Sequence, residues 1–490
     1  MSVTFHIETV GCQMNVLDSE LITASLLREG FQYVENPKLA DILLFNTCSI
    51  RQHAEDKIYS ALGRLKHVKK YYPQKILGVI GCMAQKEGEM IFSRAPHVDL
   101  VVGPGQIARI PYLISKIRAG QTPQLELSLD RRGKNRQEVE SSFDFYDPTR
   151  DLLARENPYQ AMVRIMFGCD QFCTYCIVPH VRGPEQSRGM EEVLAEVQQL
   201  ASQGCREITF IGQTVSKYHD ESGNRLSDLL EKTERITESS SLQRIRFVTS
   251  HPNSMTPDLL EAVRDLPHVV PYFHVPAQSG SDAVLKRMNR GYTVQKYREM
   301  LDEIHQTVPG AAITSDFIVG FCGETEEEFQ QTMKLTEDAR FKNSFIFKFS
   351  PREGTKAYQL YADDVPEEVK KRRNNELLEL QNRISAEDNE RFEGQMVEIL
   401  VEGLSKNMKK LPVLTEGFPE EEEKTGFGKG GMSGEEKPEE MVQLTGRTAC
   451  DRIVVFDGPR SLAGTMQNIK ITRTSAFTLF GEMMVSGREE

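Results

Sequence analysis

The sequence predicts an α/β protein with three parts: an N-terminal parallel α/β domain, a central partial (β/α)6 barrel and a small C-terminal β-barrel. Short apolar runs alternate with amphipathic helical segments over residues 1–120, and this alternation starts again near residue 160. After Gly394 the helical pattern stops and five short alternating runs follow. Alternating strands and helices are typical of parallel sheets, whereas consecutive short strands indicate an all-β unit.

Length and composition restrict the class of protein. The chain has 490 residues, enough for two to four domains, and 39% of them are apolar. No apolar run approaches the roughly 20 residues that span a bilayer. The first residues, "MSVTFHIETVGC", lack the basic region and apolar core of a secretory signal. We therefore expect a cytoplasmic protein with no membrane segment, whose nine cysteines serve metal binding or catalysis rather than a disulfide framework.

The net charge of −12 argues at first against a nucleic-acid partner. Half of that charge, however, comes from residues 416–440, a Gly- and Pro-rich stretch that we predict to be a disordered acidic insertion. Basic clusters remain at Lys66, Lys69 and Lys70; at Arg131, Arg132, Lys134 and Arg136; at Lys370, Lys371, Arg372 and Arg373; and at Lys406, Lys409 and Lys410. Overall charge therefore does not decide the partner.

The N-terminal domain, residues 1–120, combines strands and cysteines. The runs "TFHIETV", "ADILLFN" and "KILGVIG" read as buried parallel strands, and "DSELITASLLREG" as a helix closed by Gly30. Each strand is followed closely by a cysteine, namely Cys12, Cys48 and Cys82. The carboxyl ends of parallel strands meet at one edge, where open α/β sheets bind ligands. The sequence thus predicts a three-cysteine site there, the alternative being three buried and inert cysteines.

A polar linker is expected over 121–158, followed by the barrel over 159–390. Its candidate strands are 161–167, 207–212, 244–249, 270–275, 311–319 and 344–349. Barrel enzymes work at the carboxyl ends of their strands. A charged helix over roughly 365–392 leads to the C-terminal domain, 391–487. Its strands are expected at 395–403, 441–448, 452–458, 467–475 and 477–483. Small barrels of this kind often bind oligonucleotides, although a fold alone does not establish a function.

Directly after the first barrel strand comes "FGCDQFCTYCIVPHVRG", with Cys169, Cys173 and Cys176 spaced C-x3-C-x2-C. Structural zinc sites usually have four protein ligands, and no second closely spaced cysteine pair is present. A zinc ion completed by His180 or by a distant residue remains an alternative. Soft thiolates also select iron–sulfur clusters, and three ligands to four irons would leave one iron open for chemistry.

This motif, with Tyr175 before the last cysteine, resembles the radical S-adenosylmethionine (SAM) enzymes. Together with "ETVGCQMNVLDSE", "NTCSIRQHAEDKIYSALG", "GCMAQ", "TSHP" and "QSGS", it resembles the methylthiotransferase family within them, over essentially the whole chain. The resemblance implies a methylthiotransferase N-terminal domain, a radical SAM barrel and a TRAM domain. Two residues depart from the family pattern: Cys322 stands in place of a usual proline and Thr214 in place of a usual asparagine.

The resemblance also implies two [4Fe–4S] clusters and SAM. Cys12, Cys48 and Cys82 would bind an auxiliary cluster, and Cys169, Cys173 and Cys176 the cluster that binds SAM. The segment "NTCSIRQHAEDK" favours the branch that adds a methylthio group to carbon 2 of N6-isopentenyl(dimethylallyl)adenosine at position 37 of tRNA. The alternatives are modification of a ribosomal-protein aspartate, or a non-catalytic metal-stabilised RNA-binding protein. An electron donor such as a flavodoxin or ferredoxin and a monomeric state are also expected.

Candidates for the SAM pocket are Tyr175, Gln213, Gln278 and Asp316. Packing alone is the alternative role for Tyr175. We expect His251 and His274 to fix loops rather than to act as general bases. In "GETEEEF", the glutamates are expected in the first turn of a helix capped by Thr325. The remaining cysteines, Cys205, Cys322 and Cys450, lack ligand spacing and are expected to be incidental.

Overall fold

The computed structural model describes residues 2–49, 52–129, 135–142, 148–405 and 441–483. It separates into two compact units, Met1–Ile384 and Ser385–Glu490, which we describe one at a time. The N-terminal domain and the central barrel both belong to the first unit. The acidic insertion at 416–440, the basic cluster at 406–410 and most of the one at 131–136 lie outside the described residues.

A six-stranded parallel sheet forms the N-terminal domain, with strand order β2-β1-β3-β4-β5-β6. Its strands are β1 (Thr4–Val10), β2 (Gln32–Tyr33), β3 (Ile42–Thr47), β4 (Ile76–Ile80), β5 (Leu100–Val102) and β6 (Gln124–Glu126). Every residue of β3 and β4 is buried, as expected for central strands covered on both faces. The three strands predicted here are confirmed.

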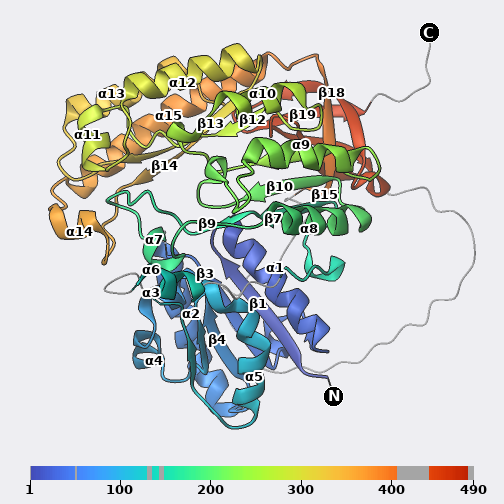
Figure 1. The fold of residues 1–490 in the computed structure, drawn as a ribbon, viewed down its shortest axis with the longest axis vertical. Coiled ribbons are helices and arrows are strands. Elements are labelled where there is room, and N and C mark those ends of the chain that lie inside the picture. The colour runs from blue at the N-terminus through green and yellow to red at the C-terminus, as the bar shows by residue number, and fades with distance from the viewer. Residues whose placement is uncertain (1, 50–51, 130–134, 143–147, 406–440, 484–490) are drawn as a thin grey trace, which may run out of the picture. The chain divides into compact units, whose positions relative to one another are not determined.

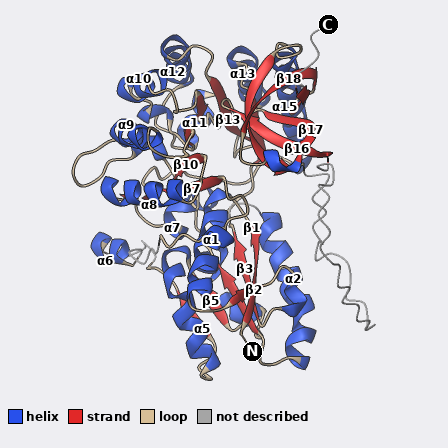
Figure 2. Cartoon of the chain, turned by 90° about the vertical axis from the view of Figure 1, so that its right-hand side faces the viewer, coloured by secondary structure: helices blue, strands red, loops and turns tan. Residues whose placement is uncertain are grey.

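Helices cover both faces of this sheet, α1 and α5 on one side and α2 on the other (Figure 2). They are α1 (Gln13–Arg28), α2 (Gln52–Tyr71), α3 (Cys82–Glu87), α4 (Met90–Arg94) and α5 (Ile110–Arg118). The second face packs Leu43 and Phe45 of β3 and Val79 of β4 against Leu62 of α2 and Met83 of α3. The sheet is therefore a rigid base for the loops at the carboxyl ends of its strands.

Helix α1 begins five residues earlier than predicted, because Cys12 is its N-cap. A thiol is not among the side chains that usually signal this position, so the sequence did not reveal the true start. The other end agrees with the prediction. Gly30 has φ +82°, its amide donates to Leu27 O and that of Phe31 to Leu26 O, the paired bonds of a Schellman motif.

The expected linker, 121–158, is not wholly irregular. Gln124–Glu126 pairs with β5 as the sixth strand of the sheet, and α6 spans Arg136–Ser141. The prediction of an irregular segment is therefore corrected at these two places. An edge strand of three residues with the sequence "QLE" has no apolar run, which is why periodicity did not predict it.

The central barrel is parallel and incomplete, as predicted. Its strands form two three-stranded sheets, β7-β10-β11 and β12-β13-β14, linked by an isolated bridge between Ile245 and Val269. The strands are β7 (Gln160–Arg164), β10 (Glu207–Ile211), β11 (Arg244–Phe247), β12 (Tyr272–His274), β13 (Ala312–Val319) and β14 (Asn343–Lys348). Each lies within two residues of a predicted strand at its start. A short antiparallel pair, β8 (Met166–Phe167) with β9 (Gln186–Ser187), follows β7.

Helices pack on the outside of the barrel strands (Figure 1). They are α7 (Val178–Val181), α8 (Met190–Ser202), α9 (Leu226–Thr237), α10 (Pro257–Asp265), α11 (Asp282–Arg287), α12 (Val294–Thr307), α13 (Glu326–Ala339), α14 (Lys356–Leu360) and α15 (Glu367–Glu390). One apolar core joins most of them to the strands, with Ile208 and Phe210 of β10 among its fully buried members. The exceptions are α7 and α14, whose buried residues Val181 and Ala357 belong to two smaller clusters. Thr325 caps α13 in a capping box with Glu328, so that prediction is confirmed.

The second unit contains a closed five-stranded barrel with order β15-β16-β17-β19-β18. Its strands are β15 (Met396–Leu404), β16 (Met441–Thr448), β17 (Ile453–Pro459), β18 (Met466–Thr474) and β19 (Thr478–Met483). All five were predicted. Apolar residues at alternating positions fill the interior, for example Val397, Ile399 and Val401 of β15.

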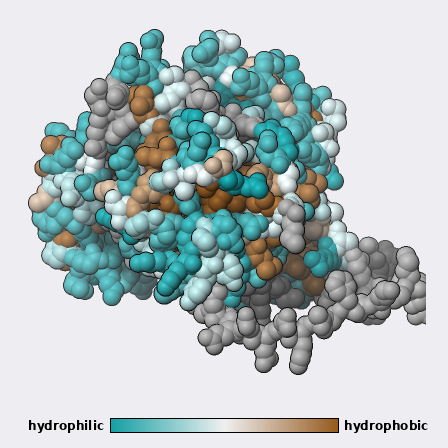
Figure 3. All heavy atoms as spheres, turned by 90° about the horizontal axis from the view of Figure 1, so that it is seen from below, coloured by the Kyte–Doolittle hydropathy of each residue, from teal (hydrophilic) through white to brown (hydrophobic). Residues whose placement is uncertain are grey.

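None of the described helices is long and apolar enough to cross a bilayer. The face shown in Figure 3 is mostly hydrophilic, with apolar side chains gathered near its middle.

Candidate functional site

The loop with Cys169, Cys173 and Cys176 lies between β8 and β9, whose pairing closes its base. The amide of Cys169 donates to Gly183 O at 3.2 Å. This close approach requires glycine at 168, where φ is +58° and a Cβ would lie 1.9 Å from Pro184 O. The backbone thus fixes the start of the cysteine loop to its end.

Arg290 holds the middle of this loop. Its Nη1 donates to Cys173 Sγ at 3.2 Å and to the Tyr175 hydroxyl at 3.5 Å, while its Nη2 donates to Pro276 O at 3.2 Å. Arg290 is buried, and Tyr175 is half-buried between two candidate ligands. The arginine therefore brings a positive charge to the sulfur atoms from the other half of the barrel.

Burial disfavours the charged form of the thiols in this loop. It raises the pKa of Cys169, and it raises that of Cys176 to about 12, with the neighbouring Cys173 adding to the second effect. Three thiolates here would need a cationic group among them. The loop is consequently suited to a metal centre rather than to a free nucleophile.

The other three cysteines lie at the carboxyl edge of the N-terminal sheet, as predicted. Cys12 follows β1, Cys48 follows β3 and Cys82 follows β4; Cys12 is exposed and the other two are buried. A hydrogen bond from Cys48 and the charge of Arg182 lower the pKa of Cys12 to about 5. The Cys12 and Cys48 side chains are therefore in direct contact.

Two buried asparagines support this edge. Asn15 Nδ2 donates to Asn46 Oδ1 at 2.8 Å, and Asn46 Nδ2 returns a bond to Asn15 O at 2.8 Å. Cys12 Sγ contacts Asn15 Oδ1 at 3.3 Å. The pair joins the start of α1 to the end of β3, and so sets Cys12 beside Cys48.

Arg182 connects the two cysteine sets. It follows α7, which begins two residues after Cys176, and its Nε donates to Cys82 Sγ at 3.2 Å. Its Nη2 donates to Asp18 Oδ2 at 2.8 Å, and Arg164 binds the other oxygen of Asp18. The two sets therefore meet at one four-residue helix: the first set directly precedes α7 in the chain, and Cys82 of the second set packs against Ile177 and Val181.

The donor chemistry of the two cysteine sets is suited to iron–sulfur clusters. Among the residues that the structure describes, no three His, Cys, Asp or Glu side chains form a group that could hold a single metal ion. Each set offers three sulfur donors and a guanidinium bonded to one of them, a soft donor set with a hydrogen bond to sulfur.

The predicted SAM residues lie on the barrel strands or just beyond them. Gln213 follows β10 and Gln278 follows β12, whereas Asp316 lies within β13. Gln278 has φ +68°, and its amide donates to Asp316 O at 2.8 Å. Gln213 Oε1 and Asp316 Oδ1 are buried without a hydrogen-bond partner. Buried polar atoms are normally bonded, so these two mark places where a polar ligand fits.

The two histidines act differently from each other. His251 Nδ1 accepts from the Asn253 amide at 3.3 Å and caps the turn after β11, and burial lowers its pKa to about 3. His274 Nδ1 bonds Thr314 Oγ1 at 3.0 Å, with Nε2 3.6 Å from Asp316 Oδ1. His251 thus fixes a loop as predicted, whereas His274 faces a predicted SAM residue.

Thr214 and the remaining cysteines are also placed. Thr214 is buried with its hydroxyl 3.9 Å from Cys169 Sγ. Cys205 lies in the barrel core, and Cys322 packs in a small apolar cluster with Phe321. Cys450 contacts Arg452 in the second unit. No structural observation gives these three cysteines a ligand role.

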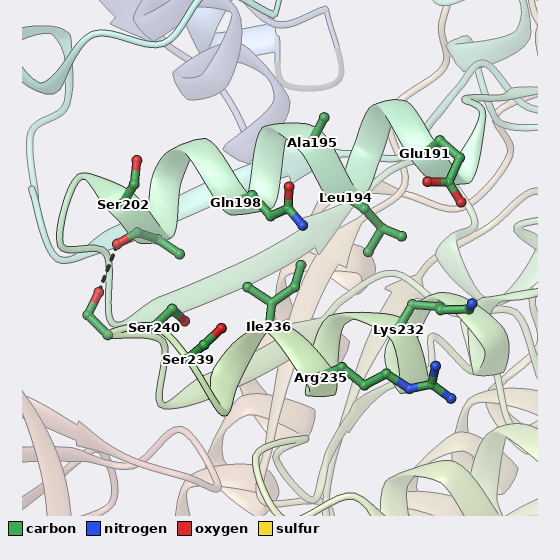
Figure 4. Close-up of a pocket in the computed structure, with 12 residues that line it drawn as sticks. Glu191, Leu194, Ala195, Gln198, Ser202, Lys232, Arg235, Ile236, Ser239 and Ser240 are labelled. Carbon is green, nitrogen blue, oxygen red and sulfur yellow. Dashed lines mark hydrogen bonds between the residues drawn. The ribbon is translucent and has the colours of Figure 1, made fainter.

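A groove of about 830 Å³ lies outside the barrel between α8 and α9, where Leu194 and Gln198 face Lys232 and Ile236 (Figure 4). None of the residues predicted from the sequence lines it. It is on the helical side of the barrel, whereas the cysteine loop lies at the strand ends. We therefore do not assign the chemistry to this groove.

Sequence reasoning missed Asp18, Arg164, Arg182, Arg290 and the Asn15–Asn46 pair. Charged residues in one sequence look like surface residues until their partners are known, and Asp18 is 146 residues from Arg164. A usable signal existed only for Arg182, which stands in the same short segment as the cysteine loop.

Comparisons with known proteins agree with this arrangement. Residues 163–336 match the family model of the radical SAM superfamily, and residues 4–103 match "Uncharacterized protein family UPF0004". Among solved structures, the radical S-adenosylmethionine methyltransferase TsrM from Kitasatospora setae is similar, with a TM-score of 0.54 and 13% identity. The match covers 73% of this chain and 74% of that one, and at this identity it supports the fold alone.

Sequence relatives are much closer. The tRNA-2-methylthio-N(6)-dimethylallyladenosine synthase of Rhodopirellula baltica is 52% identical over 99% of this chain and 96% of that protein. The protein of the same name from Delftia acidovorans is 42% identical over 99% of this chain and 100% of its own. The chain belongs to the family of tRNA-2-methylthio-N(6)-dimethylallyladenosine synthases.

Proposed function

We propose that this chain is an enzyme that inserts a methylthio group at carbon 2 of N6-isopentenyladenosine at position 37 of tRNA. Relatives that are 52% and 42% identical over their full length carry the name of this activity. The superfamily match adds an iron–sulfur cluster and SAM to the chemistry. Carbon 2 of adenine is unactivated toward ordinary nucleophilic substitution, which is the reason for radical chemistry.

One observation carries this proposal. Two sets of three cysteines meet at α7, joined by the packing of Cys82 on Ile177 and by the bond from Arg182 to Cys82. A radical SAM enzyme needs only the first set. The second set provides a place where sulfur can be held beside the radical site, and this favours sulfur insertion over other radical SAM reactions.

In this proposal Cys169, Cys173 and Cys176 hold the cluster that binds SAM, and Cys12, Cys48 and Cys82 hold the auxiliary one. When bound, these groups supply the radical and the sulfur. The chain positions them: Gly168 closes the first loop, Arg290 donates to Cys173, and the Asn15–Asn46 pair fixes Cys12. Four of the six cysteines, Cys48, Cys82, Cys169 and Cys173, are buried, which limits the access of water to the groups that they hold.

Tyr175, Gln213, Gln278 and Asp316 hold SAM. Gln213 Oε1 and Asp316 Oδ1 are suited to this because they are buried acceptors without a hydrogen-bond partner. Backbone strain supports the same place: Gln278 and Thr249, both beyond strand ends, have positive φ values of +68° and +70°. Non-glycine residues held in this region gather at ligand sites.

The C-terminal barrel grips the tRNA backbone. On β18, Lys470 and Arg473 are both exposed, and the Arg473 guanidinium lies over the Phe480 ring at 3.9 Å. A fixed cation beside an aromatic ring suits phosphate and base contacts. A flavodoxin or ferredoxin supplies electrons, and the enzyme works as a monomer in the cytoplasm.

The test is nucleoside analysis by mass spectrometry after anaerobic incubation of the reconstituted chain with isopentenylated tRNA, SAM and a reductant. We expect 2-methylthio-N6-isopentenyladenosine and 5′-deoxyadenosine, and no product with tRNA that lacks the isopentenyl group. Unmodified tRNA together with a methylthiolated ribosomal-protein peptide would favour the aspartate-modifying alternative. Absence of 5′-deoxyadenosine altogether would favour a non-catalytic RNA-binding protein.

A further inference from the structure

In the proposed function Arg182 only joins the two cysteine sets, yet it is buried and touches a candidate cluster ligand. It belongs to the barrel, whereas Cys82 and Asp18 belong to the N-terminal domain. Its Nε–Sγ distance to Cys82 is 3.2 Å and its Nη2–Oδ2 distance to Asp18 is 2.8 Å. The guanidinium is therefore fixed at both ends, by a carboxylate and by a sulfur.

The charges around Arg182 are unevenly shared. Asp18 is fully buried and binds Arg164 through one oxygen and Arg182 through the other. Its single negative charge is divided between two guanidinium groups. A buried charge is costly unless it is compensated. Asp18 balances only part of the positive charge of Arg182, so the sulfur atoms that Arg182 faces balance the rest.

The other cysteine set repeats this arrangement. Arg290 is buried, and its Nη1 donates to Cys173 Sγ at 3.2 Å. Arg290 is anchored differently, by Pro276 O and the Tyr292 hydroxyl at 3.2 and 3.0 Å, neither of which carries a formal negative charge. Each set of three cysteines thus has one sulfur bonded to a buried guanidinium from the barrel.

We infer that Arg182 is a positioning residue that orients Cys82 and raises the reduction potential of the cluster bound by Cys12, Cys48 and Cys82. Hydrogen bonds to sulfur and nearby positive charge stabilise the more negative, reduced state of an iron–sulfur cluster. The inference rests on the proposed function, in which these cysteines hold the auxiliary cluster. It adds that the barrel, rather than the N-terminal domain alone, sets the potential of this cluster.

The test is a redox titration followed by electron paramagnetic resonance on the full-length chain, comparing wild type with Arg182→Lys and Arg182→Gln. Each is also made with Cys169, Cys173 and Cys176 replaced by alanine, so that the remaining signal belongs to the auxiliary cluster. We expect a lower midpoint potential in both Arg182 variants. The shift should be larger for glutamine, which removes the charge, than for lysine, which keeps it.

Arg164→Lys is the matched control, because Arg164 shares Asp18 but donates to no cysteine in the bonds described above. It should leave the auxiliary potential unchanged. Arg290→Gln, in the chain with all six cysteines, should move only the potential of the other cluster.

Three results would overturn the inference. The first is a wild-type potential in both Arg182 variants with full iron content. The second is an equal shift in Arg164→Lys, which would mean that domain packing through Asp18 sets the potential. The third is a triple-alanine chain that binds no iron, and this result would also remove the auxiliary cluster from the proposed function. If Arg182→Gln does not fold, the midpoint potentials of Arg182→Lys and of the control Arg164→Lys test the inference.

Discussion

Asp18 is the carboxylate on which two arginines of the barrel depend. We predict that Asp18→Asn lowers the free energy of unfolding by about 3–5 kcal/mol, because it removes the buried carboxylate that Arg164 and Arg182 share. Urea unfolding of the full chain measures this change. Lys334→Gln is the control, since the Lys334–Asp338 pair on α13 is exposed and its removal should leave the unfolding midpoint unchanged. If Asp18→Asn lowered the free energy of unfolding by less than about 1 kcal/mol, solvent would have to reach Asp18 and its two arginines.

Gly168 has a different residue-scale role, in the shape of the cysteine loop. Gly168→Ala should displace Cys169 and reduce iron binding by the C-x3-C-x2-C set, because the new Cβ would lie 1.9 Å from Pro184 O. Gly310→Ala separates this clash from backbone strain, since Gly310 also has a positive φ, +80°, but a Cβ added there would meet nothing within 4 Å. Both changes should cost about 1–2 kcal/mol of stability through φ alone. Equal iron content in the two variants would contradict the steric explanation.

At the scale of elements, the loop from β13 to α13 has a pH-sensitive group. Burial raises the pKa of Glu324 from 4.5 to about 7, even though the carboxylate accepts from Gly320 N and Arg373. Between those pH values the folded chain keeps a proton that the unfolded chain has released. The free energy of unfolding should therefore fall as the pH rises from about 4.5 to about 7, by up to about 3 kcal/mol. Glu324→Gln should remove this part of the pH dependence in denaturant titrations.

Glu326, two residues further on, changes the free energy of unfolding with pH in the opposite direction. Its bonds to Arg372 lower its pKa to about 2, so its contribution is present above pH 4.5 and is lost as the pH falls toward 2. Glu326→Gln should change the pH dependence of the free energy of unfolding only within this acidic range. If both variants altered the same pH range, the assignment of the two carboxyl groups would be wrong.

The elements themselves were largely predictable. Six barrel strands and five C-terminal strands were expected from apolar runs and alternation, and the structure has them. The misses were local: β2 has two residues and β5 and β6 have three each, too short for a periodic pattern, and α1 starts at an unusual cap, Cys12. Short edge strands form because a neighbouring strand offers free amide and carbonyl groups, and that information is tertiary.

At the scale of the whole molecule, the two units have different proposed roles. In the function proposed above, cluster binding belongs to Met1–Ile384 and tRNA binding to Ser385–Glu490, the two compact units of the chain. We predict that Lys470→Gln and Arg473→Gln weaken tRNA binding and each reduce the slope of log affinity against log salt by about 1. Formation of 5′-deoxyadenosine from SAM without tRNA should not change. An unchanged salt slope in a filter-binding titration would place the tRNA contacts elsewhere.

The candidate site was predictable only in part, for a physical reason. Cysteines are few and their spacing is a local property, so all six candidate ligands could be named from the sequence. The groups that support them could not be named, because Asp18, Arg164, Arg182 and Arg290 act through partners that folding brings together. Sequence spacing indicates candidate ligands, whereas burial and pairing indicate the residues that would orient them.

The central claim is that the chain holds two clusters, each on three cysteines. Iron analysis after anaerobic reconstitution tests it directly, on wild type and on chains with either set of three cysteines replaced by alanine. The account predicts about eight irons per wild-type chain, about four in each triple variant and none when all six cysteines are replaced. Wild-type iron near four, with no further loss when Cys12, Cys48 and Cys82 are replaced, would contradict it.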